Sequence, residues 1–167
     1  MKQSLKSSVL VNLALIASAL MSLAEPFAEI DERIVTIGGA ATEIVFALGA
    51  GSSIVATDLS SIYPPQAREL PMVGYVRNIS PEGVLSMEPD LVIATGALGP
   101  PNAREMLERL DIDIMWLPNL NAPEELLSSI KMVSERLARA EVAKSLIEDV
   151  NRDLIQACLL YTSPSPR

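Results

Sequence analysis

The chain has 167 residues, of which 49% are hydrophobic and 20% are charged, so it can bury one core without disulfide or metal support. Its net charge of -8 and its lack of a basic block disfavour nucleic acid and anionic membrane surfaces as partners. It contains one cysteine and no histidine, which excludes an intramolecular disulfide, His-dependent catalytic triads and His-ligated metal sites.

Residues 1–24 have the features of a secretory signal peptide. Lys2 and Lys6 form a positive region, residues 9–23 form an uncharged and mostly apolar stretch, and small residues precede an expected cleavage after Ala24. A membrane anchor is the alternative, but the apolar stretch is shorter than the roughly 20 residues that cross a bilayer. We therefore expect the protein to be exported from the cytoplasm.

The following residues alternate between short apolar runs and helical patterns. We expect strands at 33–37, 53–56, 91–94 and 112–117. Helices are expected at 42–48, 80–88, 102–110 and 123–137, with a last long helix from about residue 140. The run at 91–94 is apolar throughout, which is typical of a parallel strand covered on both faces. The alternation predicts an α/β fold in which helices flank a parallel sheet.

The end of the chain departs from this pattern. Residues 141–156 carry an apolar stripe at helical spacing, and the register then stops. Residues 158–167 are rich in Ser and Pro at their end and resemble translated sequencing-adaptor sequence. We expect this segment to be a non-native tail on a protein truncated near Ala157; a genuine short Ser/Pro tail is the alternative.

Ligands of parallel α/β sheets bind beyond the carboxyl ends of the strands. The loops expected there are 38–41, 57–79, 95–101 and 118–122. The turn at Gly38-Gly39 opens a helix and can hold an anion, but the glycine spacing of nucleotide-binding and phosphate-binding loops is absent, which favours a plain tight turn. Asp58 and Glu69 form no obvious pair of catalytic carboxylates.

Tyr75 and Arg77 form the most distinctive pair in these loops. In an extended segment, residues 75 and 77 point to the same side. A guanidinium beside a phenol favours the phenolate, and a phenolate is a ligand of ferric haem iron. In a chain without histidine, Tyr75 is the best candidate for an axial ligand. The alternative is ordinary loop packing with a surface hydrogen bond.

Other charged residues have two interpretations each. Glu43 and Glu82 are placed in the first turns of expected helices, where they either stabilise the helix dipole or contact a basic partner. Arg68, Arg77 and Arg104 lie in or near the expected ligand loops, where they either receive an anionic ligand such as the two haem propionates or form ordinary solvated surface.

Several segments together resemble the periplasmic haem-binding proteins of bacterial haem ABC importers. The segments are residues 33–48, the Tyr63-Pro64-Pro65 turn, residues 70–77 and residues 80–94. The resemblance covers roughly residues 30–157. Most of the pattern is shared with corrinoid-binding and siderophore-binding proteins, and the segment Gly74-Tyr75-Val76-Arg77 is what looks specific to haem.

The resemblance implies roles for individual residues. Tyr75 is implied as the axial iron ligand and Arg77 as the group that keeps its phenol ionised. Glu82 occupies the place of an acid that docks onto arginines of the membrane permease, and Glu43 lies in a Thr-Glu motif shared by the family. The family has two lobes joined by one long helix, and this sequence matches the N-terminal lobe and the start of that helix.

The resulting prediction divides the chain into four parts. These are a signal peptide (1–24), an N-terminal α/β lobe (25–139), the start of the interlobe helix (140–157) and a non-native tail (158–167). We expect a monomeric, periplasmic, non-enzymatic protein that binds haem, delivers it to an ABC permease and does not span the membrane after cleavage. The alternatives are the same fold carrying a corrinoid or ferric siderophore, an exported α/β enzyme acting on a phosphorylated small molecule, and a fragment too unstable to function.

Overall fold

The computed structural model describes residues 30–96, 98–100 and 102–162 of the chain. The predicted signal peptide lies outside the described residues, and so does the end of the predicted tail from residue 163. No helix in the described part is long and apolar enough to cross a membrane.

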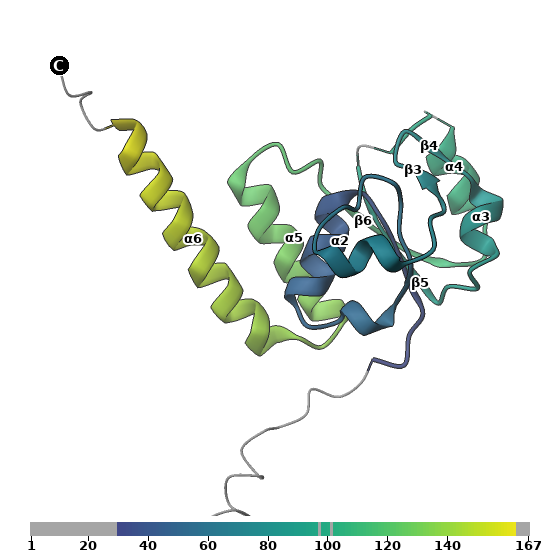
Figure 1. Ribbon diagram of the computed structural model, residues 1–167, viewed down its shortest axis with the longest axis horizontal. Coiled ribbons are helices and arrows are strands. Elements are labelled where there is room, and N and C mark those ends of the chain that lie inside the picture. Colours follow the sequence, from purple (N-terminus) through teal and green to yellow (C-terminus); the bar gives the residue numbers. More distant parts are fainter. Residues whose placement is uncertain (1–29, 97, 101, 163–167) are drawn as a thin grey trace, which may run out of the picture.

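A four-stranded parallel sheet forms the centre of the molecule (Figure 1). Its strands follow the order β2 (Ile54–Ala56), β1 (Ile34–Ile37), β5 (Leu91–Thr95) and β6 (Asp113–Leu117). The two middle strands, β1 and β5, are buried along their whole length. This burial on both faces explains their nearly continuous apolar sequence.

Helices cover both faces of the sheet (Figure 1). The first core contains residues of α2 (Gly39–Ala47), α5 (Pro123–Arg136) and α6 (Ala140–Thr162). The second contains residues of α3 (Pro81–Leu85), α4 (Ala103–Glu108) and the hairpin of β3 (Gly74–Tyr75) and β4 (Asn78–Ile79). Successive residues of a strand pack in different cores: Ile34 and Ile93 pack in the first, and Val35 and Val92 pack in the second. The predicted fold class, a parallel sheet flanked by helices, is confirmed.

The start of α2 differs from the sequence prediction. The helix begins at Gly39, three residues early, because Gly38 adopts a φ of 100° and its carbonyl accepts a hydrogen bond from Thr42 N at 3.3 Å. Glu43 therefore lies in the second turn, and its predicted place in the first turn is wrong. It is too far along the helix for the N-terminal dipole to explain its presence.

The end of α6 also differs. The predicted apolar stripe packs on the first core through Val142, Leu146, Ile147 and Val150. The helix then continues to Thr162, past the predicted end of the register, since no Gly or Pro interrupts the chain before Pro164.

Candidate functional site

The buried carboxylate of Asp58 organises the loops at the carboxyl edge of the sheet. Asp58 lies two residues after the end of β2 and is only 1% exposed. Its Oδ1 accepts hydrogen bonds from Gly38 N and Ser61 Oγ, both at 2.8 Å. Its Oδ2 accepts from Ser60 N at 3.0 Å, Ser60 Oγ at 2.6 Å and Val76 N at 3.1 Å. One side chain therefore joins the end of β1, its own loop and the β3–β4 hairpin.

A chain of buried hydroxyl groups extends this network into the core. Ser61 Oγ lies 2.7 Å from Thr42 Oγ1, which lies 2.7 Å from Thr36 Oγ1 of β1. Gly39 N donates to Ser60 Oγ at 3.2 Å. The N–H groups of the Gly38-Gly39 turn are thus bonded within the protein, as expected for a tight turn rather than a phosphate-binding loop.

The hairpin that carries Tyr75 is held on two sides. Leu59 N, in the loop after β2, donates to Gly74 O at 2.8 Å. Gly99 N, in the loop after β5, donates to Val76 O at 2.9 Å. Gly74 has a φ of 120°, which a side chain would disfavour, so the glycine is needed where the chain enters the hairpin. Tyr75 is therefore presented on a braced turn at the carboxyl edge of the sheet.

The predicted geometry of Tyr75 and Arg77 is wrong in one respect. β3 ends at Tyr75, and Val76 and Arg77 form the two-residue turn before Asn78, so the segment is not extended and the two-residue alternation does not apply. Among the described residues, no hydrogen bond joins the phenol to the guanidinium. Tyr75 itself is 43% exposed.

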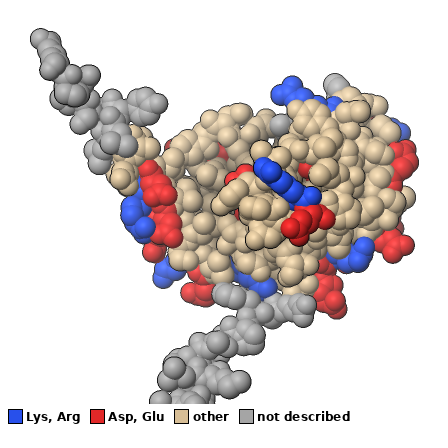
Figure 2. All heavy atoms as spheres, viewed as in Figure 1, with Lys and Arg blue, Asp and Glu red and all other residues tan. Residues whose placement is uncertain are grey.

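Exposed apolar side chains gather in the same stretch of sequence as Tyr75. Five large hydrophobic residues between positions 59 and 75 are at least 43% exposed, namely Leu59, Ile62, Tyr63, Met72 and Tyr75. On the face seen in Figure 2, much of the surface between α5 and α3 is uncharged, but a basic and an acidic group project from its centre. An apolar surface of this kind on a folded domain is typical of a ligand-binding or partner-binding site.

The two other predicted haem-site arginines lie apart from Tyr75 in sequence and have partners of their own. Arg68, in the short helix η2 (Pro65–Glu69), donates from Nε to Ile62 O at 2.9 Å. Arg104 pairs with Glu108 at 2.8 Å, and its guanidinium lies 4.3 Å from the ring centre of Trp116. No hydrogen bond or ion pair between described residues joins any two of Tyr75, Arg77, Arg68 and Arg104.

Glu82 is exposed in the first turn of α3, as predicted. Ser80 caps the start of α3, since its Oγ accepts from Gly83 N at 3.0 Å, and Pro81 is the first residue of the helix. Ser80 Oγ also donates to Glu82 Oε2 at 3.1 Å. Glu43 is exposed on α2. Both acids are accessible to a partner.

One feature of the site bears on what it can bind. No group of three or more His, Cys, Asp or Glu side chains in the described part of the chain is arranged to hold a metal ion.

The Asp58 network was missed by sequence analysis, which considered Asp58 only as one half of a carboxylate pair. The available signal was an acidic residue close to the end of an apolar run, with two nearby serines, Ser60 and Ser61, whose side chains are typical local hydrogen-bond partners.

Comparison with known proteins places this arrangement in a family. A family model described as periplasmic binding protein matches residues 34–157. The vitamin B12-binding protein of Vibrio cholerae is 35% identical over 144 residues, which cover 86% of this chain and 51% of that protein. The chain thus spans about half the length of the curated relatives it matches.

Solved structures give the same result. A periplasmic haem-binding protein from Pseudomonas aeruginosa matches with a TM-score of 0.73 and 32% identity, over 81% of this chain and 50% of that one. The periplasmic vitamin B12-binding protein of Vibrio cholerae matches with a TM-score of 0.71 and 34% identity, over 81% and 52%. These relatives are binding proteins and not enzymes, which removes the exported enzyme as an alternative. The chain belongs to the periplasmic binding protein family.

Proposed function

We propose that the chain is the N-terminal lobe of a periplasmic substrate-binding protein that binds haem and delivers it to the permease of an ABC importer. One observation carries the choice of haem. Tyr75 stands 43% exposed on a braced hairpin, beside a stretch of exposed apolar side chains at the carboxyl edge of the sheet. A porphyrin needs an apolar contact surface for its ring and a ligand for its iron, and this edge offers both.

The chemistry of each group fits a ferric porphyrin. A phenolate oxygen is an anionic ligand that suits ferric iron. Leu59, Ile62 and Met72 offer apolar contact area for a macrocycle. Arg77 follows Tyr75 in the hairpin turn, and Arg68 and Arg104 provide further positive charge for the two propionates, since a guanidinium forms paired hydrogen bonds with a carboxylate.

Ferric haem titration tests this proposal. The wild-type chain should give a saturable high-spin spectrum with an iron–phenolate vibration in resonance Raman. Tyr75→Phe should lose that vibration and bind haem more than about tenfold more weakly, because it removes only the ligating oxygen. The matched control is Tyr63→Phe, which removes a hydroxyl from the other exposed tyrosine of the same loop and should leave the spectrum unchanged. A Tyr75→Phe spectrum identical to wild type would refute Tyr75 as the ligand.

A corrinoid is the second candidate ligand. It is favoured by the 35% identity to a vitamin B12-binding protein. A corrinoid would use the same apolar surface without iron ligation by a phenolate. Saturable binding of cyanocobalamin that survives Tyr75→Phe, together with no saturable binding of haem, would replace haem by a corrinoid.

We propose Glu82, and with it Glu43, as acids that dock onto basic residues of the permease. Glu82→Gln should lower ligand-stimulated ATP hydrolysis by the transporter in proteoliposomes severalfold, because a rim charge at an interface steers and orients docking. Haem affinity should not change. The control is Glu105→Gln, which alters an exposed acid in the first turn of the neighbouring α4. Equal effects of the two substitutions would contradict a specific role for Glu82.

A further inference from the structure

The residue directly opposite Tyr75 in the β3–β4 hairpin is Asn78. The antiparallel register pairs Gly74 with Ile79 and Tyr75 with Asn78. Directly opposite residues of an antiparallel pair project their side chains from the same face, with Cβ atoms about 5 Å apart. The side chains of Tyr75 and Asn78 are therefore neighbours on one face of the hairpin.

This face of the hairpin points away from the core. Ile79 is only 6% exposed and packs in the second core, whereas the preceding residue, Asn78, is exposed. Successive residues of a strand point to opposite faces, so Asn78 and its partner Tyr75 lie on the outer face. A ligand that reaches Tyr75 on this face therefore meets Asn78 as well.

Contacts on both sides of the turn fix this register. Val76 N donates to Asp58 Oδ2 at 3.1 Å, and Val76 O accepts from Gly99 N at 2.9 Å. An added Cβ on Gly99 would lie 3.2 Å from Arg77 O, so the loop after β5 packs closely on the backbone of the turn. A slip of the pairing by one residue would disrupt these contacts and turn Ile79 out of the core. Arg77 consequently stays in the turn, and the strand pairing does not bring its side chain beside the phenol.

The amide of Asn78 is free to donate to a ligand or to the phenol. It forms no hydrogen bond with any residue that the structure describes. An asparagine amide carries two N–H donors and no charge. A phenolate oxygen that is bound to iron keeps a lone pair for such a donor, and a hydrogen bond to an anionic oxygen is among the stronger ones in proteins.

We propose that Asn78 is a positioning residue for iron ligation, whose amide donates a hydrogen bond to the phenolate oxygen of Tyr75 in the haem-bound protein. The inference rests on the proposed function, since it takes Tyr75 as the iron ligand. It gives Asn78 the place beside the phenol that the sequence suggested for Arg77. A hydrogen bond to a ligating oxygen draws electron density away from the iron, so it weakens the iron–oxygen bond and makes ferric haem easier to reduce.

The geometry is tested first on the ligand-free chain, labelled with ¹³C and ¹⁵N. Nuclear Overhauser cross-peaks should join the ring protons of Tyr75 to the side-chain protons of Asn78. The ring current should also shift those Asn78 protons relative to their positions in Tyr75→Leu. The side chain of Arg77 should show neither effect. Cross-peaks from the ring to Arg77 and none to Asn78 would overturn the inference, whether or not the chain binds haem.

The role in ligation is tested with ferric haem and Asn78→Leu, which keeps the size of the side chain and removes its N–H donors. The iron–phenolate vibration should move to higher frequency and the midpoint potential should fall. Haem affinity should change less than about tenfold, because the stronger iron–oxygen bond offsets the lost hydrogen bond. The matched variant Arg77→Leu should weaken binding through the propionates and leave the frequency of the vibration where it is in the wild type.

The possible failures are distinguishable. Haem binding through Tyr75 with an unchanged vibration in Asn78→Leu would overturn this inference and leave the proposed function in place. A shift in Arg77→Leu as large as that in Asn78→Leu would also overturn it. An absence of saturable haem binding by the wild-type chain would refute the proposed function and, with it, the role of Asn78.

Discussion

Replacing Asp58 by asparagine is expected to lower the free energy of unfolding by about 3 kcal/mol, although the two side chains have nearly the same size. Both carboxylate oxygens act only as acceptors, and together they take five hydrogen bonds from three segments of the chain. An asparagine amide has an NH₂ group in place of one of these oxygens. In either orientation that group faces N–H donors, so at least one buried backbone N–H loses its acceptor.

The loss of stability in Asp58→Asn should be local as well as global. If the amide nitrogen replaces Oδ2, Val76 N loses its partner and the hairpin of Tyr75 loses one of its three attachments. Urea unfolding followed by circular dichroism measures the stability, and amide hydrogen exchange measures Val76 directly. Exchange at Val76 should accelerate more than exchange at Ile93 in the sheet centre. Under the proposed function, the same substitution should broaden the iron–phenolate vibration, because the ligating tyrosine is less firmly held.

Asp90→Asn is the matched control for this change. Asp90 is exposed and its Oδ2 accepts one hydrogen bond from Arg33 N at 2.8 Å, which an asparagine oxygen can also accept. The change in stability should stay within about 0.5 kcal/mol. Similar losses in Asp58→Asn and Asp90→Asn would contradict the central role of the Asp58 carboxylate.

Gly38→Ala is the second substitution with a large expected effect, a loss of about 3 kcal/mol in unfolding free energy. Gly38 has a φ of 100° and a ψ of 130°, a conformation that residues with a side chain rarely adopt. An added Cβ would also lie 2.9 Å from Thr95 Cγ2 and closer to Thr95 Oγ1. Thr95 is buried at the end of β5, so it has little room to move away.

Gly49→Ala separates the two causes of this effect. Gly49 also has a positive φ, 72°, but nothing lies within 4 Å of an added Cβ. Only the cost of the left-handed conformation remains there, which is about 1 kcal/mol. Thermal unfolding of both variants measures the difference. A loss in Gly38→Ala no greater than that in Gly49→Ala would show that contact with Thr95 does not constrain the turn.

The elements of the fold were largely predictable from the sequence because local patterns and tertiary burial agree. The apolar runs at β1 and β5 became the two fully buried central strands. The Ser80-Pro81 start of α3 was predicted correctly, since a capping hydroxyl and a proline act within one helical turn. The apolar stripe of α6 packs on the core with its expected spacing.

The predictions that failed concern contacts between distant segments. Tyr75 and Arg77 were expected in an extended segment, but Val76 N bonds to Asp58 and Val76 O bonds to Gly99 N, and these contacts favour a hairpin turn. The start of α2 was placed too late because Gly38 is held in its unusual conformation by Asp58. Asp58 and Gly99 are distant in sequence from the residues they contact, so no local sequence pattern predicts these contacts.

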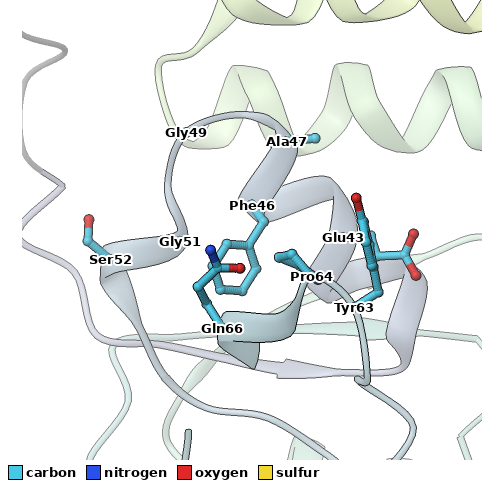
Figure 3. A pocket seen from close by; sticks show the side chains of 9 residues that line it. All are labelled: Glu43, Phe46, Ala47, Gly49, Gly51, Ser52, Tyr63, Pro64 and Gln66. Carbon is cyan, nitrogen blue, oxygen red and sulfur yellow. The ribbon is translucent and has the colours of Figure 1, made fainter. Parts of the chain in front are cut away.

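By itself, the sequence determined the α/β class, the order of the four sheet strands and the main helices along the chain, and the residue types at the proposed site, because burial, capping and turn formation act over a few residues. The β3–β4 hairpin and η2 fall in the stretch 57–79, which was predicted only as a loop. The tertiary structure alone decided that Asp58 joins three loops into one edge, that Tyr75 ends β3 beside a hairpin turn and that Glu43 borders a pocket with Phe46 and Tyr63 (Figure 3). The reason is physical: hydrogen bonds to a buried carboxylate depend on which loops meet in space, and the packing of the whole sheet determines that meeting.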